Sequence, residues 1–157
     1  MPARRELIGK LALLGGFAAV APQAAAQTPS KRFVKRDSAE RSGYSQAVVT
    51  QGGGRTIWLA GHTGAVDATG KSLAGDFDAQ VRAVFAAIET TLGEAGGKLS
   101  DMVTMTVFLV DARHTTRMTE IRSEIFGNDF AASAAITVMG FADPTMMIEI
   151  QGVAVPE

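Results

Sequence analysis

The spacing of apolar residues between positions 76 and 92 predicts the clearest element of this chain. Large apolar side chains recur there at helical spacing and fall on one face of an α-helix. They are Phe77, Val81, Val84, Phe85, Ile88 and Leu92. We therefore expect a helix that begins near Asp76 and ends at Gly93 or slightly later, at Gly96-Gly97.

A second helix is predicted in the stretch that follows position 114. Its apolar residues again share one face: Met118, Ile121 and Ile125. A hydroxyl at Thr115 or Thr116 can cap the first turn, and Gly127 can end the last one.

Short apolar or β-branched runs elsewhere predict six strands. These runs are 33–36, 45–50, 56–60, 103–110, 134–139 and 146–155. The glycine-rich segment 51–55 separates the second run from the third, so we expect a hairpin that pairs them.

The element order is β-β-β-α-β-α-β-β, which favours an α+β fold with both helices on one face of a six-stranded sheet. The last run alternates Ile148 and Ile150 with Glu149 and Gln151, so its two faces differ in chemistry. A sheet face with polar residues among apolar ones is typical of a subunit interface that also holds a cleft.

Composition narrows the classes of function. A chain of 157 residues, 46% apolar and 20% charged, suits one globular domain. The formal charge of −1 disfavours a nucleic-acid-binding surface, and the absence of cysteine excludes disulfides and thiolate chemistry. His62 and His114 lack the spacing of a metal site, and Gly52-Gly53-Gly54 lacks the lysine of a phosphate loop. We expect no metal and no cofactor.

The N-terminal segment predicts an export signal. Arg4, Arg5 and Lys10 precede an apolar run over 11–21, which is too short to span a bilayer, since that needs roughly 20 residues. Small residues at Ala24 and Ala26 suit signal peptidase. We therefore expect a signal peptide over 1–26, a flexible lead-in over 27–32 and one domain over 33–157.

Two export routes remain open. The pair Arg4-Arg5 resembles a twin-arginine signal, but adjacent arginines also occur in general secretory signals. Cleavage after Ala26 would leave a chain with a formal charge of −3 and no stable membrane anchor. A bacterial periplasmic or secreted protein is expected in either case.

Several segments, in matching order and spacing, resemble the RidA (YjgF/YER057c/UK114) family of enamine/imine deaminases. They are Ser42-Gly43-Tyr44-Ser45-Gln46, Ile57-Trp58-Leu59-Ala60-Gly61-His62-Thr63-Gly64, the run 130–138 and Met146-Met147-Ile148-Glu149-Ile150. The resemblance extends from about Phe33 to Val155. It implies the chorismate-mutase-like fold with a six-stranded mixed sheet, a homotrimer, and small-molecule clefts between subunits.

The resemblance also implies roles for four residues. Glu149 matches an acidic residue thought to hold the water that attacks the imine carbon, and Tyr44 matches a tyrosine that lines the cleft. Gly61 would let a ligand approach the backbone closely. A serine of the family is replaced by Ala60, so His62 could supply the polar group instead. Packing or interface roles for Tyr44, His62 and Glu149 remain open alternatives.

Ser133 departs from the family pattern. Active members carry at this position an arginine that grips the substrate carboxylate, and a serine has one hydroxyl and no charge. Ser133 and Thr137 share strand parity and could face one cavity, with the Ala135 backbone between them. Arg55 and Arg113 are candidates for a replacement cation.

Two functions follow as expectations. The first is hydrolysis of an enamine or imine, with release of ammonia, on a substrate other than the usual 2-imino acids. The second is a non-catalytic periplasmic module that binds a metabolite or a partner protein. A ribonuclease is disfavoured because the chain has no basic stripe.

Overall fold

The computed structural model describes residues 28–35 and 43–157. The predicted signal peptide over 1–26 lies outside the described residues. No helix in the described part of the chain combines the length and apolar character needed to cross a membrane.

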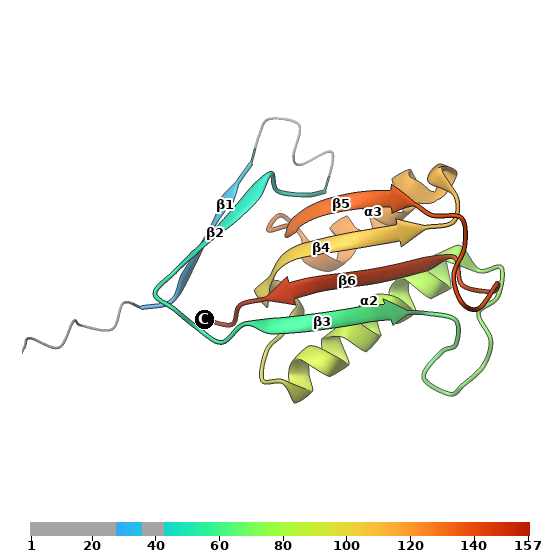
Figure 1. Cartoon of the computed structure of the whole chain (residues 1–157), viewed down its shortest axis with the longest axis horizontal. Coiled ribbons are helices and arrows are strands. Elements are labelled where there is room, and N and C mark those ends of the chain that lie inside the picture. The colour runs from blue at the N-terminus through green and yellow to red at the C-terminus, as the bar shows by residue number, and fades with distance from the viewer. Residues whose placement is uncertain (1–27, 36–42) are drawn as a thin grey trace, which may run out of the picture.

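Four strands form the main sheet, in the order β3-β6-β4-β5 (Figure 1). Their bounds are β3 Ile57–Thr63, β4 Met102–Leu109, β5 Ala132–Thr137 and β6 Ile148–Ala154. Strand β6 runs antiparallel to β3 and β4, whereas β4 and β5 are parallel, so the sheet is mixed as predicted. Helices α2 (Phe77–Glu94) and α3 (Thr115–Phe126) both lie behind it in Figure 1.

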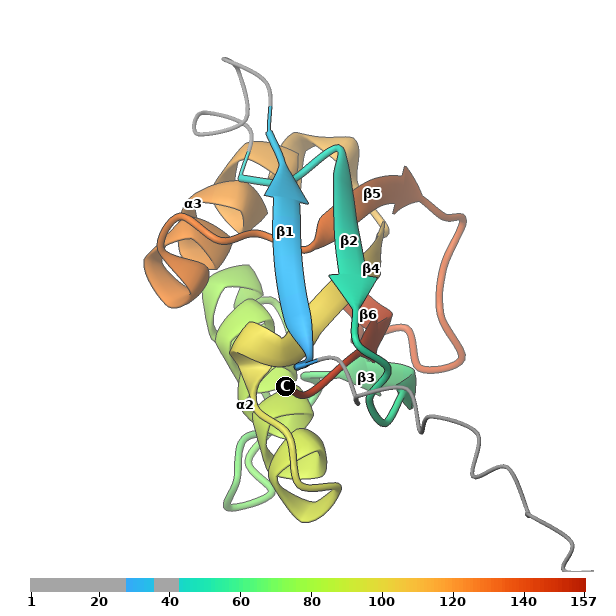
Figure 2. The ribbon, with the colours of Figure 1, turned by 90° about the vertical axis from the view of Figure 1, so that its left-hand side faces the viewer.

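The remaining strands, β1 (Ser30–Val34) and β2 (Ala47–Gln51), form a separate two-stranded antiparallel sheet. Figure 2 shows this pair crossing one end of the main sheet. The six expected strands are thus divided between two sheets. An ion pair of 3.0 Å between Lys31 and Asp101, both nearly buried, helps to hold β1 against the domain.

The predicted hairpin over 51–55 is wrong, because β2 pairs with β1 and β3 pairs with β6. Gly52 and Gly53 adopt positive φ values of 88° and 62°, and they lead the chain from one sheet to the other. A Cβ on Gly52 would stand 2.5 Å from the carbonyl oxygen of Thr28, so glycine is also required by the close backbone approach.

Helix α2 confirms the prediction from apolar spacing. The Asp76 carboxylate accepts a hydrogen bond of 3.0 Å from the Ala79 amide and caps the first turn. The helix ends at Glu94, and the amide of Gly97 then donates to the Leu92 carbonyl at 2.7 Å. The predicted apolar stripe is buried against the sheet: Phe77, Val81, Val84, Phe85, Ile88 and Leu92.

Helix α3 begins where expected but with a different cap. A short 3₁₀ turn over Ala112–His114 precedes it, and Thr115 is its first residue, with no side-chain hydrogen bond at the N-cap, His114. The imidazole of His114 instead stacks on Phe77 of α2 at 4.1 Å. Gly127, with φ of 65°, ends the helix as predicted.

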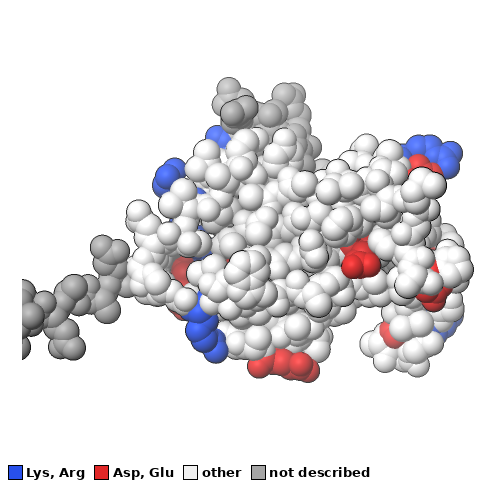
Figure 3. All heavy atoms as spheres, in the orientation of Figure 1, with Lys and Arg blue, Asp and Glu red and all other residues white. Residues whose placement is uncertain are grey.

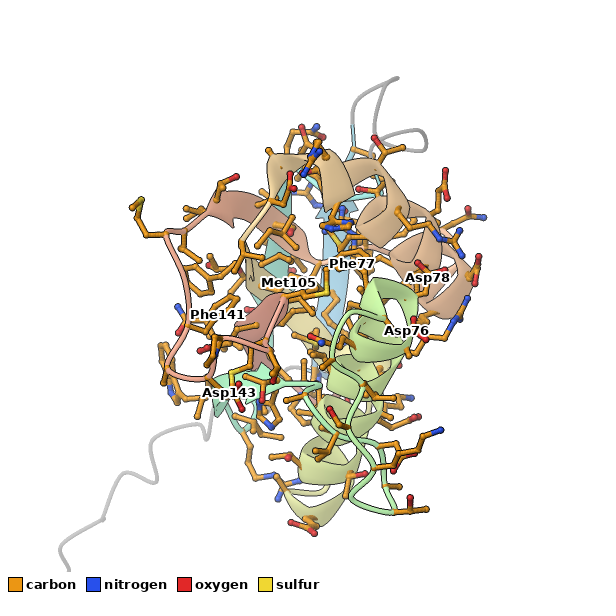
Figure 4. The ribbon with its side chains drawn as sticks, turned by 90° about the vertical axis from the view of Figure 1, so that its right-hand side faces the viewer. Asp76, Phe77, Asp78, Met105, Phe141 and Asp143 are labelled. Atoms are coloured by element: carbon orange, nitrogen blue, oxygen red, sulfur yellow. The ribbon has the colours of Figure 1, made fainter. Side chains whose placement is uncertain are left out.

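A buried glutamine joins α2 to two loops. Gln80 is fully buried; its amide group donates to the carbonyls of Leu73 and Thr145 at 3.0 and 2.8 Å, and its oxygen accepts from the Met147 amide at 2.9 Å. Figure 4 shows this end of the molecule, with Asp76 in the loop before α2 and Asp143 in the loop that leads to β6. Gln80 thereby fixes where β6 starts.

Candidate functional site

Glu149 lies on the face of the main sheet that the helices leave open. Its neighbours in sequence, Ile148 and Ile150, are fully buried on the helix side, and its cross-strand partners are Thr63 and Phe108. The side chain itself is half-buried.

The Glu149 carboxylate lies directly against the backbone of Gly61. A Cβ at Gly61 would stand 1.8 Å from the carboxylate oxygen Oε1, which no real side chain could tolerate. Position 61 is therefore restricted to glycine as long as the carboxylate keeps this place. The structure thus brings together two of the residues predicted from the sequence.

The open face around Glu149 is almost free of charge, as Figure 3 shows. Within the four strands of the main sheet, Glu149 is the one Asp, Glu, Lys or Arg residue. Large apolar side chains are exposed on the same face, with Trp58 79% and Ile136 45% accessible. A lone carboxylate on an exposed apolar surface is typical of a site that lies at an interface with another molecule.

A pocket of about 250 Å³ opens between α3 and the edge strand β5. Five of its lining side chains can form hydrogen bonds, and two are apolar. They are Tyr44, Thr115, Thr119, Arg122 and Ser133, with Met118 and Ala135. Three residues predicted as ligand contacts, Tyr44, Ser133 and Ala135, therefore share one pocket.

This pocket and Glu149 lie on opposite sides of the sheet. Ser133 and Ala135 of β5 stand beside Met105 and Val107 of β4, which are buried on the helix side. The residues of β5 that share the open face with Glu149 are Ala132, Ala134 and Ile136. Within one chain, the two predicted halves of the site do not meet.

Arg122 is the functional candidate that sequence reasoning missed. Its Nη1 donates a hydrogen bond of 2.9 Å to the Ser133 hydroxyl, and the residue is only 3% exposed. Burial lowers the pKa of Arg122 to about 10, against a smaller raising effect of Tyr44, so the group stays cationic at neutral pH. The sequence did hold a signal: Arg122 follows Met118 by one helical turn, on the apolar face of α3.

Gly43 brings Tyr44 to this pocket. It has a φ of 62°, and a Cβ there would stand 3.1 Å from Thr119 and Ser123 and 3.5 Å from the Arg122 guanidinium. The chain then continues along β5, because the Ser45 amide donates to the Ala131 carbonyl at 3.2 Å. The glycine therefore allows the chain to turn tightly against α3 with Tyr44 at the pocket.

The two cations suggested by the sequence lie elsewhere. Arg55 donates to the Gly96 carbonyl at 3.0 Å, beyond the end of α2. Arg113 is exposed and binds Asp111 through Nε and Nη2, and these hydrogen bonds lower the pKa of Asp111 to about 2. Neither arginine lines the pocket, and the cation that lies next to Ser133 is Arg122.

His62 faces α2, on the other side of the sheet from Glu149. Its Nδ1 lies 2.9 Å from the Ala60 carbonyl, which can only accept, so Nδ1 carries the proton. Its Nε2 lies 2.9 Å from the Thr91 hydroxyl. The two residues predicted as catalytic are thus separated within one chain, and His62 bridges β3 and α2.

Thr137 has the parity of Ser133, as predicted, but it is exposed at the end of β5 and does not line the pocket. Among the described residues, no group of three or more His, Cys, Asp or Glu side chains could hold a metal ion.

Comparison with known proteins identifies the family. Residues 35–156 match the family model described as endoribonuclease L-PSP. A RutC family protein of Pyrococcus abyssi is 34% identical over 114 residues, which are 73% of this chain and 87% of that protein. The human 2-iminobutanoate/2-iminopropanoate deaminase is 30% identical over 112 residues, 71% of this chain and 79% of that protein.

Solved structures agree with the sequence matches. The Rid family protein YyfB of Yersinia pestis, titled a protein of unknown function, superposes with a TM-score of 0.69 at 29% identity. The match covers 80% of this chain and 98% of that one. The α+β architecture, with two helices on one face of a mixed sheet, is shared with these neighbours. This chain belongs to the RidA/YjgF family, whose model bears the description endoribonuclease L-PSP.

Proposed function

We propose that this protein hydrolyses the C=N bond of a small imine, or of the enamine from which it forms, and releases ammonia. The observation that carries the proposal is the Glu149 carboxylate, held against Gly61 on an otherwise uncharged face. The names of the human relative and of a 25% identical relative from Dermatophagoides farinae, both 2-iminobutanoate/2-iminopropanoate deaminases, support this class of reaction.

The proposed reaction needs one water and one base. Glu149 orients the water and takes a proton from it as the water oxygen bonds to the imine carbon. Glu149 passes this proton to the imine nitrogen, which gives a neutral carbinolamine. In its collapse the C–N bond breaks and a C=O bond forms, while Glu149 takes the hydroxyl proton and delivers it to the nitrogen, which leaves as ammonia. Gly61 serves by leaving the carboxylate and the backbone open to the substrate.

The cleft is proposed to lie between subunits of a homotrimer. The pocket at Arg122 and the carboxylate of Glu149 lie on opposite faces of one sheet, so a single cleft that uses both needs two copies of the chain. The exposed apolar residues Trp58 and Ile136 would be covered by such an assembly. Light scattering that showed a stable monomer would contradict this arrangement.

Glu149→Gln tests the reaction. The variant keeps the shape of the side chain but not its basicity, so we expect ammonia release from freshly generated imines to fall about 100-fold. Glu89→Gln, an exposed change on α2, is the matched control and should retain full turnover. Turnover by Glu149→Gln at the rate of the unaltered protein would remove Glu149 from the mechanism.

A non-catalytic metabolite-binding module is the second candidate, and Ser133, in place of the family's arginine, favours it. This candidate predicts a folded protein that binds small molecules but releases no ammonia from any imine, with or without a carboxylate.

Export through the segment 1–26 is proposed from its composition alone. A reporter fused behind this segment should reach the periplasm of a bacterial host. Replacing Arg4 and Arg5 with lysine should stop export by the twin-arginine route but not by the general secretory route. A reporter retained in the cytoplasm without any replacement would refute the signal.

A further inference from the structure

The pocket between α3 and β5 combines one buried cation with several hydroxyl groups. Arg122 contributes the guanidinium, and hydroxyls come from Tyr44, Thr115, Thr119 and Ser133. Each hydroxyl can donate one hydrogen bond, and a guanidinium only donates. The lining is therefore rich in donors around a positive charge, which suits a ligand group that accepts hydrogen bonds and is negative.

Ser133 holds Arg122 in place and keeps a donor for the ligand. Its oxygen accepts the bond from Arg122 Nη1 at 2.9 Å. The hydroxyl proton of Ser133 must then point away from Nη1, and it can donate to a group bound beside the guanidinium. In the family pattern, position 133 on strand β5 carries an arginine. In this chain Ser133 occupies that position and holds Arg122, which comes from helix α3.

Burial strengthens the electrostatic attraction between the Arg122 guanidinium and an anion in the pocket. The residue is 3% exposed, and the loss of water around it is the main cause of its lowered pKa. An oxyanion bound in the pocket would form charge-assisted hydrogen bonds with the guanidinium, in place of the hydrogen bonds that water makes to an exposed arginine. The volume of about 250 Å³ suits an acid of a few heavy atoms and is too small for a nucleotide.

We propose that Arg122, positioned by Ser133, is the specificity-determining residue of the cleft and binds a small oxyanion carried by the ligand. The inference rests on the cleft of the proposed function, but it assigns the anion-binding group to helix α3 instead of strand β5. It gives Arg122 the role of replacement cation for which Arg55 and Arg113 were the candidates from the sequence.

Binding of simple probes tests the inference without any turnover. Propanoate, inorganic phosphate and the neutral propanamide are titrated calorimetrically into the purified protein at neutral pH. We expect propanoate or phosphate to bind at least tenfold more tightly than propanamide. Binding of propanoate alone would indicate a carboxylate ligand, and tighter binding of phosphate would indicate a phosphate ester.

Four variants test whether Arg122 is the residue that binds the anion. Arg122→Gln should weaken binding of the preferred anion at least tenfold, and Arg122→Lys, which keeps the charge, should weaken it less. Ser133→Ala should weaken it severalfold. Arg82→Gln, at an exposed arginine of α2, is the control and should bind as the unaltered protein does. Arg122→Lys and Ser133→Ala keep the test valid if Arg122→Gln does not fold.

The outcomes separate the inference from the proposed function. Equal affinity for propanamide and propanoate, no detectable binding of either anion, or anion binding that survives in folded Arg122→Gln would each overturn the inference, even if imines are hydrolysed. Arg122-dependent anion binding by Glu149→Gln, at the affinity of the unaltered protein, would support it. The inference would also stand if anions bind through Arg122 but no imine is hydrolysed, and the proposed reaction would then fail.

Discussion

At the scale of single residues, close contacts decide what each position tolerates. Gly61 and Glu149 are far apart in sequence. The Glu149 carboxylate can nevertheless keep its position only because residue 61 has no side chain. The family resemblance suggested both residues, but the contact between them follows from the pairing of β3 with β6.

Gly61→Ala tests this contact. The added methyl group would stand 1.8 Å from Oε1, so the Glu149 side chain must leave its position. Because this half-exposed side chain is flexible, we expect the free energy of unfolding, measured by urea denaturation, to change by less than about 1 kcal/mol, whereas imine hydrolysis should be lost. Gly93→Ala is the matched control, because nothing lies near its Cβ; in helix α2 it should stabilise by about 0.5–1 kcal/mol. Full imine turnover in Gly61→Ala would contradict the described contact.

The charge of Arg122 gives a prediction about pH. Burial lowers its pKa to about 10, so the guanidinium loses its proton at a lower pH than an exposed arginine does. Anion binding should therefore be constant from pH 7 to 9 and weaken as the pH rises through about 10, as measured by calorimetry. Circular dichroism at each pH serves as the control for folding, and full affinity in the folded protein at pH 11 would contradict the lowered pKa of Arg122.

At the scale of elements, helix α2 was predictable because its information is local. Apolar spacing and the cap at Asp76 lie within the helix itself. Strand pairing is different: the alternation in each strand was visible, but the partner of β2 was not. The positions of the loops around α2 could not be predicted from the sequence either, because they depend on hydrogen bonds from the buried side chain of Gln80 to the carbonyls of Leu73 and Thr145.

Replacing Gln80 tests how strongly α2 holds these loops. Gln80→Leu would fill most of the space but leave the carbonyls of Leu73 and Thr145 and the amide of Met147 without their buried partner. We expect a loss of about 3 kcal/mol in the free energy of unfolding in urea. Glu89→Gln, exposed on the same helix, should change it by less than about 0.5 kcal/mol. A Gln80→Leu variant as stable as this control would show that the three hydrogen bonds contribute little.

At the scale of the whole molecule, the two halves of the proposed cleft lie on opposite faces of one sheet. Glu149 lies on the open face, and Arg122 lines the pocket behind β5. If neighbouring chains complete each cleft, one chain supplies the carboxylate and the next supplies the guanidinium.

Mixed assemblies test this arrangement. Chains carrying Glu149→Gln and chains carrying Arg122→Gln are unfolded together, refolded in equal amounts and assayed for ammonia release. Each variant alone should be nearly inactive, but the mixture should recover about a quarter of normal turnover, because some interfaces join an intact Glu149 to an intact Arg122. Arg82→Gln mixed with Glu149→Gln is the control for refolding. No recovery above the separate variants would contradict a cleft that takes Glu149 from one chain and Arg122 from the next.

The sequence by itself determined the helices, the strand positions and the family, because apolar period, caps and motif order are local properties of the chain. It also indicated Glu149, Gly61, Tyr44 and Ser133 as candidate site residues. Tertiary structure alone decided that β1 pairs with β2, that His62 and Glu149 lie on opposite faces, and that Arg122 meets Ser133. These facts depend on strand register and on how a helix packs against a sheet edge, and both arise from contacts between residues distant in sequence.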